Sequence, residues 1–204
     1  LLARCYGRLG DIEGQIEALT ELVRLRPDDL MAFEELGFAC DEEGMTDEAI
    51  KMYQRALEKA ASLPADVLLL DLEDAVAPEA KPAAREAVCA AVGGRPYGRR
   101  EVVVRINALA TPWGHDDLAA AVAAGVDGIL APKVDSEAAI AELDQALTSA
   151  GAPPDMTLWA MIETPMAILN IGEIAACGRS SRLDVLVMGT NDLVRSFSAG
   201  GAQQ

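Results

Sequence analysis

From Ala61 onward, short apolar runs alternate with Ala-rich stretches of helical length, and this alternation constrains the fold more than any other feature. The apolar runs are predicted to be strands at Val67–Leu72, Val102–Ile106, Gly128–Ala131, Leu158–Ile162 and Val185–Met188. Helices are predicted between them at about 80–92, 116–124, 136–149 and 166–177. Strand, helix and strand at this spacing predict parallel pairing with right-handed crossovers, and therefore an α/β fold. Continuous apolar strands also indicate a sheet that is covered on both faces.

Polar side chains gather at the carboxyl ends of these predicted strands. They are Asp71, Glu73, Arg105, Asn107, Lys133, Glu163 and Asp192, the last in a turn expected at 189–192 after the last strand. Side chains alternate across a strand, so residues two apart, such as Arg105 and Asn107, share one face. In a β/α barrel the carboxyl ends of the strands form the rim where catalytic residues lie. The sequence therefore predicts a site at that rim of a β/α barrel, with about five parallel strands.

The residue types at these strand ends suit metal-assisted chemistry. Glu163 and Asp192 lie at adjacent strand ends and are predicted to hold Mg²⁺, which prefers oxygen ligands and few protein contacts. Arg105 offers a planar guanidinium that fits a substrate carboxylate. Glu73 and Asp74, one strand away, are placed to orient Arg105 or metal-bound water. A cation that chelates a carbonyl and its neighbouring carboxylate stabilises an enolate or alkoxide, which suits carbon–carbon cleavage.

Structural roles stay open for several of the same residues. Asp192 also fits a helix cap, because it ends a run of cap-type residues. Asp71 and Arg105 fit a buried ion pair between neighbouring strands. Lys133 could only cover the end of the barrel. The single histidine, His115, could pack within a loop rather than take part in catalysis.

The N-terminal residues contain an internal repeat instead of strands. Gly10 and Gly44 lie 34 residues apart, and the residues around them align. Small residues recur where two helices approach, large apolar residues recur on one helical face, and Pro27 closes the first unit. This pattern resembles about two tetratricopeptide repeats. The sequence therefore predicts an all-α helical region at 1–60 ahead of an α/β domain at 61–204, with a plain helical hairpin as the alternative.

Composition excludes some classes of function. With 17 basic and 33 acidic residues the net charge is −16, so the chain has no electrostatic reason to bind nucleic acid or an anionic membrane. The absence of a spanning apolar stretch and of a leader predicts a cytoplasmic protein. Four separate cysteines without a CxxC pair indicate reduced thiols. Because the chain opens on Leu1 rather than Met, we expect a fragment or a processed product.

At these motifs the chain resembles the HpcH/HpaI aldolase/citrate lyase β-subunit family, over about residues 58–196. The segments that carry the resemblance are LLLDLEDAVAPEAKPAAR (68–85), VVVRINALATPWG (102–114), GILAPKV (128–134), AMIETPMAILN (160–170) and LVMGTNDL (186–193). The resemblance implies a Mg²⁺-dependent (β/α)8 TIM barrel, here a partial one, that cleaves or forms the C–C bond of a malyl-CoA or citryl-CoA type thioester. The products would be an acyl-CoA and a 2-oxo acid. A homo-oligomer is implied as well.

The same resemblance implies roles for individual residues. They are Glu163 and Asp192 as metal ligands, Arg105, Glu73 and Asp74 as catalytic residues, and Arg105, Gly189 and Thr190 as substrate-binding residues. The chain departs from the family pattern at both ends. A first strand of the type R-S-x-L-x-x-P-G is missing, and the closing strands after GTNDL are absent, so about five strands of eight are expected.

Other hypotheses remain beside the lyase. The chain could be a non-catalytic scaffold whose repeats recruit a protein partner and whose barrel segment is degenerate or inactive. It could be a barrel enzyme that handles phosphoenolpyruvate or pyruvate, or a join of unrelated coding pieces. The segments LEDAVAPEAK and RINAL favour the thioester lyase.

Overall fold

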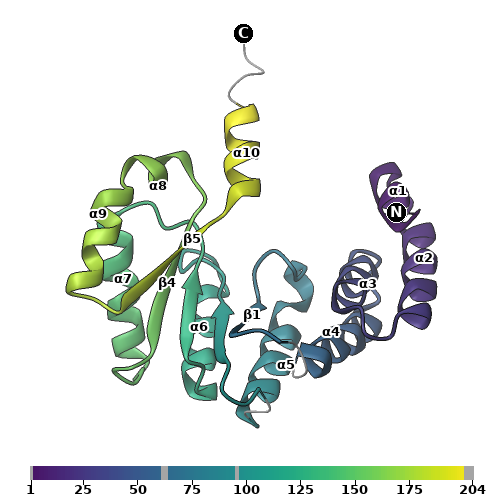
Figure 1. The fold of residues 1–204 in the computed structure, drawn as a ribbon, viewed down its shortest axis with the longest axis horizontal. Helices are drawn as coiled ribbons and strands as arrows, with labels where there is room; N and C mark the ends of the chain where they lie inside the picture. The colour runs from purple at the N-terminus through teal and green to yellow at the C-terminus, as the bar shows by residue number, and fades with distance from the viewer. Residues whose placement is uncertain (1, 61–63, 95–96, 200–204) are drawn as a thin grey trace. The chain divides into compact units, whose positions relative to one another are not determined.

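Helices make up the N-terminal part of the chain in the computed structural model, which describes residues 2–60, 64–94 and 97–199. They are α1 (Leu2–Leu9), α2 (Ile12–Leu25), α3 (Leu30–Glu42) and α4 (Thr46–Ala60) (Figure 1). Asp11 and Asp29 cap α2 and α3, each accepting a backbone N–H from the first turn. Gly10 and Gly44 take left-handed φ values of 71° and 73°. The two glycines therefore occupy equivalent turns, as the repeat pattern predicts.

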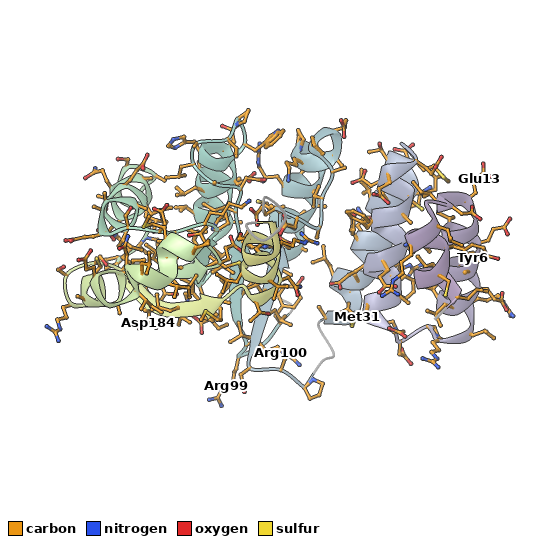
Figure 2. The ribbon with its side chains drawn as sticks, turned by 90° about the horizontal axis from the view of Figure 1, so that it is seen from above. Tyr6, Glu13, Met31, Arg99, Arg100 and Asp184 are labelled. Carbon is orange, nitrogen blue, oxygen red and sulfur yellow. The ribbon has the colours of Figure 1, made fainter. Side chains whose placement is uncertain are left out.

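The core of these helices is built from small residues packed around aliphatic ones. Its buried members are Ala3, Leu19, Leu36, Ala39, Cys40 and Ala49. Gly37 allows close packing of Tyr53, since a Cβ there would lie 2.6 Å from the ring atom Cε1. Gly14 does the same for Tyr6, which Figure 2 labels, with 2.9 Å to Cδ1. Small residues thus lie where helices approach, as the sequence predicts.

The chain divides into two compact units, Leu1–Arg100 and Glu101–Gln204. The first unit continues beyond the helices with β1 (Val67–Asp71), a 3-10 turn (Pro78–Ala80) and α5 (Lys81–Gly93). The first β/α unit therefore belongs to the same compact body as the repeat helices. The boundary predicted between residues 60 and 61 follows the sequence patterns and stays a prediction.

The second unit is a parallel sheet flanked by helices. Its elements are β2 (Glu101–Arg105), α6 (Gly114–Ala124), β3 (Gly128–Ala131), α7 (Glu137–Ser149), β4 (Thr157–Ile162), α8 (Pro165–Leu169), α9 (Ile171–Ala176), a 3-10 turn (Cys177–Arg179), β5 (Leu183–Met188) and α10 (Thr190–Ala199). The strands β2 to β5 lie in chain order and every pair is parallel. Figure 1 shows α10 leaving the end of β5 and extending beyond the sheet.

Burial differs between the strands of this sheet. All four residues of β3 are buried, as expected for a strand covered on both faces. Within β5 only Leu183 is buried, and Met188 is 53% exposed. Asp184, labelled in Figure 2, is also exposed on β5. The predicted cover on both faces therefore holds for β3 and is wrong for β5. It is also wrong at Leu69 of β1, which is 44% exposed.

The predicted α/β class with five strands is confirmed among the described residues, and two local predictions are wrong. The helix expected at 166–177 is broken at Asn170, whose φ of −99° and ψ of 9° are not helical. The side-chain amide of Asn170 donates to the Asp135 carbonyl at 2.8 Å, which holds it in that conformation. The predicted turn at 189–192 is instead the start of α10.

No helix within residues 2–60, 64–94 and 97–199 is long and apolar enough to cross a membrane. The cytoplasmic location stays a prediction.

Candidate active site

Glu163 is a buried carboxylate at the carboxyl end of β4. Only 3% of the residue is exposed. Its Oε1 accepts the backbone N–H of Lys133 at 2.8 Å. Lys133 follows β3 and has a φ of 53°, a left-handed conformation that few residues other than glycine adopt. The side chain of Lys133 is exposed. Lys133 therefore acts on this site through its backbone, and its strained conformation fixes one oxygen of Glu163.

Gly189 lies against Glu163 because β4 and β5 pair in register up to Ile162 and Met188. The N–H of Gly189 donates to the Ile162 carbonyl at 3.0 Å. A Cβ at Gly189 would lie 2.4 Å from Cβ of Glu163 and 2.8 Å from its Oε2. A side chain at this position would therefore enter the space that the carboxylate occupies. Glycine is needed here for room rather than for an unusual backbone angle.

Asp192 lies in the first turn of α10, three residues after Gly189. Its side chain is 29% exposed, and its Oδ1 is 3.5 Å from Nη1 of Arg195. A carboxylate in the first turn interacts favourably with the positive end of the helix dipole. Asp192 lies inside the first turn rather than at its cap, so the helix-cap alternative stays a prediction. The partial exposure of Asp192 also leaves its carboxylate accessible from solvent.

Arg105 ends β2 and is half buried. Its Nη1 lies 3.8 Å from the sulfur of Met161 on β4. Because β3 lies between β2 and β4, the guanidinium reaches over one strand. Met161 and Glu163 are two residues apart and share a face of β4. The structure therefore brings Arg105 toward the face that carries Glu163.

Asn107 and Asp117 form a buried pair behind the loop that follows β2. Asn107 is 3% exposed and Asp117 is fully buried. The Asp117 Oδ2 accepts the backbone N–H of Asn107 at 3.0 Å and its side-chain amide at 2.6 Å. Asn107 stands out in the sequence as a strand-end residue, whereas nothing in the sequence distinguishes the buried Asp117 from its exposed neighbour Asp116. The pair fixes the loop that begins directly after Arg105.

Glu73 and Asp74 lie in the first unit, on the loop after β1. Glu73 is 7% exposed, whereas Asp74 is exposed. Asp71 shapes this loop, since its Oδ1 accepts the N–H of Glu73 at 2.8 Å and its Oδ2 accepts that of Ala75 at 3.2 Å. Asp71 thus stabilises the loop that follows it. The roles expected for Glu73 and Asp74 stay predictions.

The donor set of the second unit suits Mg²⁺. Among the residues that the structure describes, no group of three or more His, Cys, Asp or Glu side chains could hold a metal ion. Glu163 and Asp192 would supply two carboxylates, leaving the other positions to water and substrate oxygens. Mg²⁺ commonly binds through one or two carboxylates and keeps several waters. The oxygen chemistry and the small number of protein ligands therefore fit this ion.

Parallel β/α units with acids after β4 and β5 and an arginine at the end of β2 define a β/α-barrel class of enzyme site. Within this class the chain belongs to the HpcH/HpaI aldolase/citrate lyase family, whose model matches residues 52–204. Residues 1–29 match the model of a tetratricopeptide repeat. Both family predictions are confirmed, although the repeat match covers less than the predicted 1–60.

Relatives in this family include a (3S)-malyl-CoA thioesterase of Cereibacter sphaeroides, which is 43% identical over 146 residues. That match covers 72% of this chain and 48% of the relative. The citrate lyase β subunit of Escherichia coli K12 is 38% identical, with 66% of this chain and 45% of the subunit covered. The chain thus spans about half the length of the curated relatives it matches.

A solved structure supports the same assignment. It is the citrate lyase β subunit of M. tuberculosis complexed with oxaloacetate and magnesium, with a TM-score of 0.54 and 32% identity. The match covers 73% of this chain and 57% of that one. The similarity extends from sequence to fold, and the predicted TIM-barrel relationship is confirmed.

Proposed function

We propose that this chain carries the metal-binding part of a lyase site that cleaves or forms the C–C bond of a 3-hydroxyacyl-CoA. The observation that carries the proposal is Glu163, a buried carboxylate with one oxygen held by the N–H of Lys133 and the other facing Gly189. Burying a carboxylate costs free energy unless partners compensate for the lost hydration. A cation bound by Glu163 and Asp192 would add a favourable interaction to those that the Glu163 carboxylate already makes.

Each residue of the proposed site has a distinct task. Glu163 and Asp192 would hold Mg²⁺, which when bound stabilises negative charge on a carbonyl and its neighbouring carboxylate. Arg105 would bind the carboxylate of the 2-oxo acid with its planar guanidinium. The N–H of Gly189 is bonded to the Ile162 carbonyl, so the backbone N–H groups after Gly189, beginning with that of Thr190, would face the same acid. Asn107, held by Asp117, would keep the loop after Arg105 in place.

Glu73 and Asp74 are proposed as further acids on the substrate side. This assignment rests on the LEDAV motif, and the burial of Glu73 is consistent with it. A homo-oligomer and a protein partner for the repeat helices also stay predictions.

A second candidate function is hydrolysis of the thioester itself. It is favoured by the relative that is named as a (3S)-malyl-CoA thioesterase and is 43% identical over the matched residues. Hydrolysis and C–C cleavage of malyl-CoA give different products. The first gives malate and free CoA, and the second gives glyoxylate and acetyl-CoA.

The test combines metal binding with product analysis. The chain is titrated with Mg²⁺ by calorimetry, then incubated with malyl-CoA and Mg²⁺, and the CoA species are separated by chromatography. Glu163→Gln keeps the size of the side chain but removes its charge. We expect it to weaken Mg²⁺ binding at least about tenfold and to lower turnover on the order of 100-fold, as loss of a metal ligand should.

Glu173→Gln is the matched control, because Glu173 is exposed on α9. It should leave both measurements unchanged. Free CoA as the main product would favour hydrolysis over the lyase reaction. Turnover that survives both EDTA and Glu163→Gln would contradict the proposed metal site altogether.

A further inference from the structure

The loop of residues 72–77, which carries Glu73 and Asp74, is bound by side chains from the repeat helices. The Tyr53 hydroxyl of α4 donates to the Ala75 carbonyl at 2.9 Å. The Asp41 Oδ2 of α3 accepts the N–H of Ala77 at 3.0 Å. Tyr53 lies 22 positions from Ala75 and Asp41 lies 36 positions from Ala77, so both bonds are tertiary contacts. A helical hairpin thus binds a short backbone segment within its own compact unit.

The side chains of Asp41 and Tyr53 are packed within the α3–α4 hairpin. Asp41 is 7% exposed. The Tyr53 ring packs over Gly37, where a Cβ would lie 2.6 Å from Cε1. Burial, and then the negative charge of Asp41, raises the pKa of the Tyr53 phenol. Tyr53 therefore stays protonated and remains a donor at all ordinary pH values.

The loop has a second set of bonds from its own β/α unit. Lys81, only 6% exposed, donates to the carbonyls of Leu72 and Glu73 at 3.0 and 2.9 Å. The Asp71 carboxylate accepts two N–H groups of the loop, as described above. These bonds fix the loop from its beginning next to β1 as far as the N–H of Ala75. The bonds from Asp41 and Tyr53 fix its later half, at residues 75 and 77.

We propose that Asp41 and Tyr53 are positioning residues, through which the α3–α4 hairpin holds the loop that presents Glu73 and Asp74. The second repeat, formed by α3 and α4, is then part of the same unit as the acidic loop. Its Asp41 and Tyr53 side chains bind that loop rather than a separate protein. A movement of α3 or α4 would be transmitted directly to the acidic loop. That Asp41 and Tyr53 hold the loop follows from these contacts. That holding the loop affects catalysis rests on the proposed function.

The experiment uses the full chain and three substitutions. Tyr53→Phe keeps the ring over Gly37 and removes the hydroxyl. Asp41→Ala removes the acceptor of the Ala77 N–H, and Asp41→Asn restores an oxygen that can accept it. Amide hydrogen exchange is measured residue by residue by NMR. We expect exchange within 75–77 to quicken about fivefold in Tyr53→Phe and Asp41→Ala, and to return toward the parent rate in Asp41→Asn.

Tyr6→Phe is the matched control, because it removes a hydroxyl from another ring that packs against a glycine of the repeat. It should leave exchange within 75–77 unchanged. Unaltered exchange in Tyr53→Phe would overturn the inference, even if Asp41→Ala fails to fold. Absence of turnover in the parent chain would overturn the proposed function but not this result.

If the parent chain turns over, kcat should fall about fivefold in Tyr53→Phe with little change in Mg²⁺ affinity, since Glu163 and Asp192 are untouched. Quickened exchange with unchanged kcat would overturn the catalytic part of the inference. Equal loss of Mg²⁺ affinity would also overturn it, because that indicates general unfolding.

Discussion

At the scale of single residues, the candidate site depends on backbone groups as much as on its acids. Glu163 is oriented by the N–H of Lys133, and it fits only because Gly189 has no side chain. The motifs IET and GTND predicted the two acids from sequence. They did not predict the contact with Lys133, since hydrogen bonds between distant backbone and side-chain groups leave no pattern in sequence.

The space at Gly189 leads to a prediction. In Gly189→Ala the new Cβ would lie 2.4 Å from Cβ of Glu163, so one of the two strand ends must shift. We expect Mg²⁺ affinity, measured by calorimetry, to fall on the order of tenfold or more, because the geometry of a ligand changes. Gly172→Ala is the control, since a Cβ there meets nothing within 4 Å. Equal affinity in both variants would show that Gly189 has no role in holding Glu163.

At the scale of elements, the repeat helices are held by a narrow core of small and aliphatic residues. Leu19 of α2 is fully buried within this core. The apolar spacing and the two glycines 34 residues apart predicted these helices from sequence. The break at Asn170 was not predictable in the same way, because it depends on a bond to the distant Asp135 carbonyl.

The core of the repeats gives a prediction at this scale. Leu19→Ala should lower the free energy of unfolding by about 2–5 kcal/mol, because it removes a buried side chain and leaves a cavity. Urea denaturation followed by circular dichroism measures this. Leu9→Ala removes the same atoms from a residue that is 79% exposed and should change stability by less than about 0.5 kcal/mol. Similar losses in the two variants would mean that this helical core is not packed as described.

At the scale of the whole molecule, the charge of −16 acts on every part of the fold. Many of the described ion pairs are exposed pairs on helices, such as Arg24 with Glu21 and Arg55 with Glu58. Such pairs contribute little to stability. The repulsion among 33 acidic side chains, only partly balanced by 17 basic ones, should therefore outweigh them.

This balance predicts how stability responds to salt. Raising NaCl from 10 to 150 mM shortens the screening length from ~30 to ~8 Å. The midpoint of thermal unfolding should rise by a few degrees, on the order of 1 kcal/mol of added stability. EDTA in the buffer excludes metal binding, and sorbitol at matched osmolality is the control. A lower midpoint in salt would show that attractive ion pairs dominate.

The sequence by itself determined the α/β class, the strand order, the helical repeat and the identities of the candidate acids. It could do so because periodic burial and short motifs are local, and parallel strands in chain order place their carboxyl ends together. Only the tertiary structure decided which groups orient those acids: the N–H of Lys133 at Glu163, Asp117 at Asn107, and Asp41 with Tyr53 at the loop of residues 72–77. These contacts join residues 10 to 36 positions apart in the chain, and their partners carry no distinguishing sequence pattern.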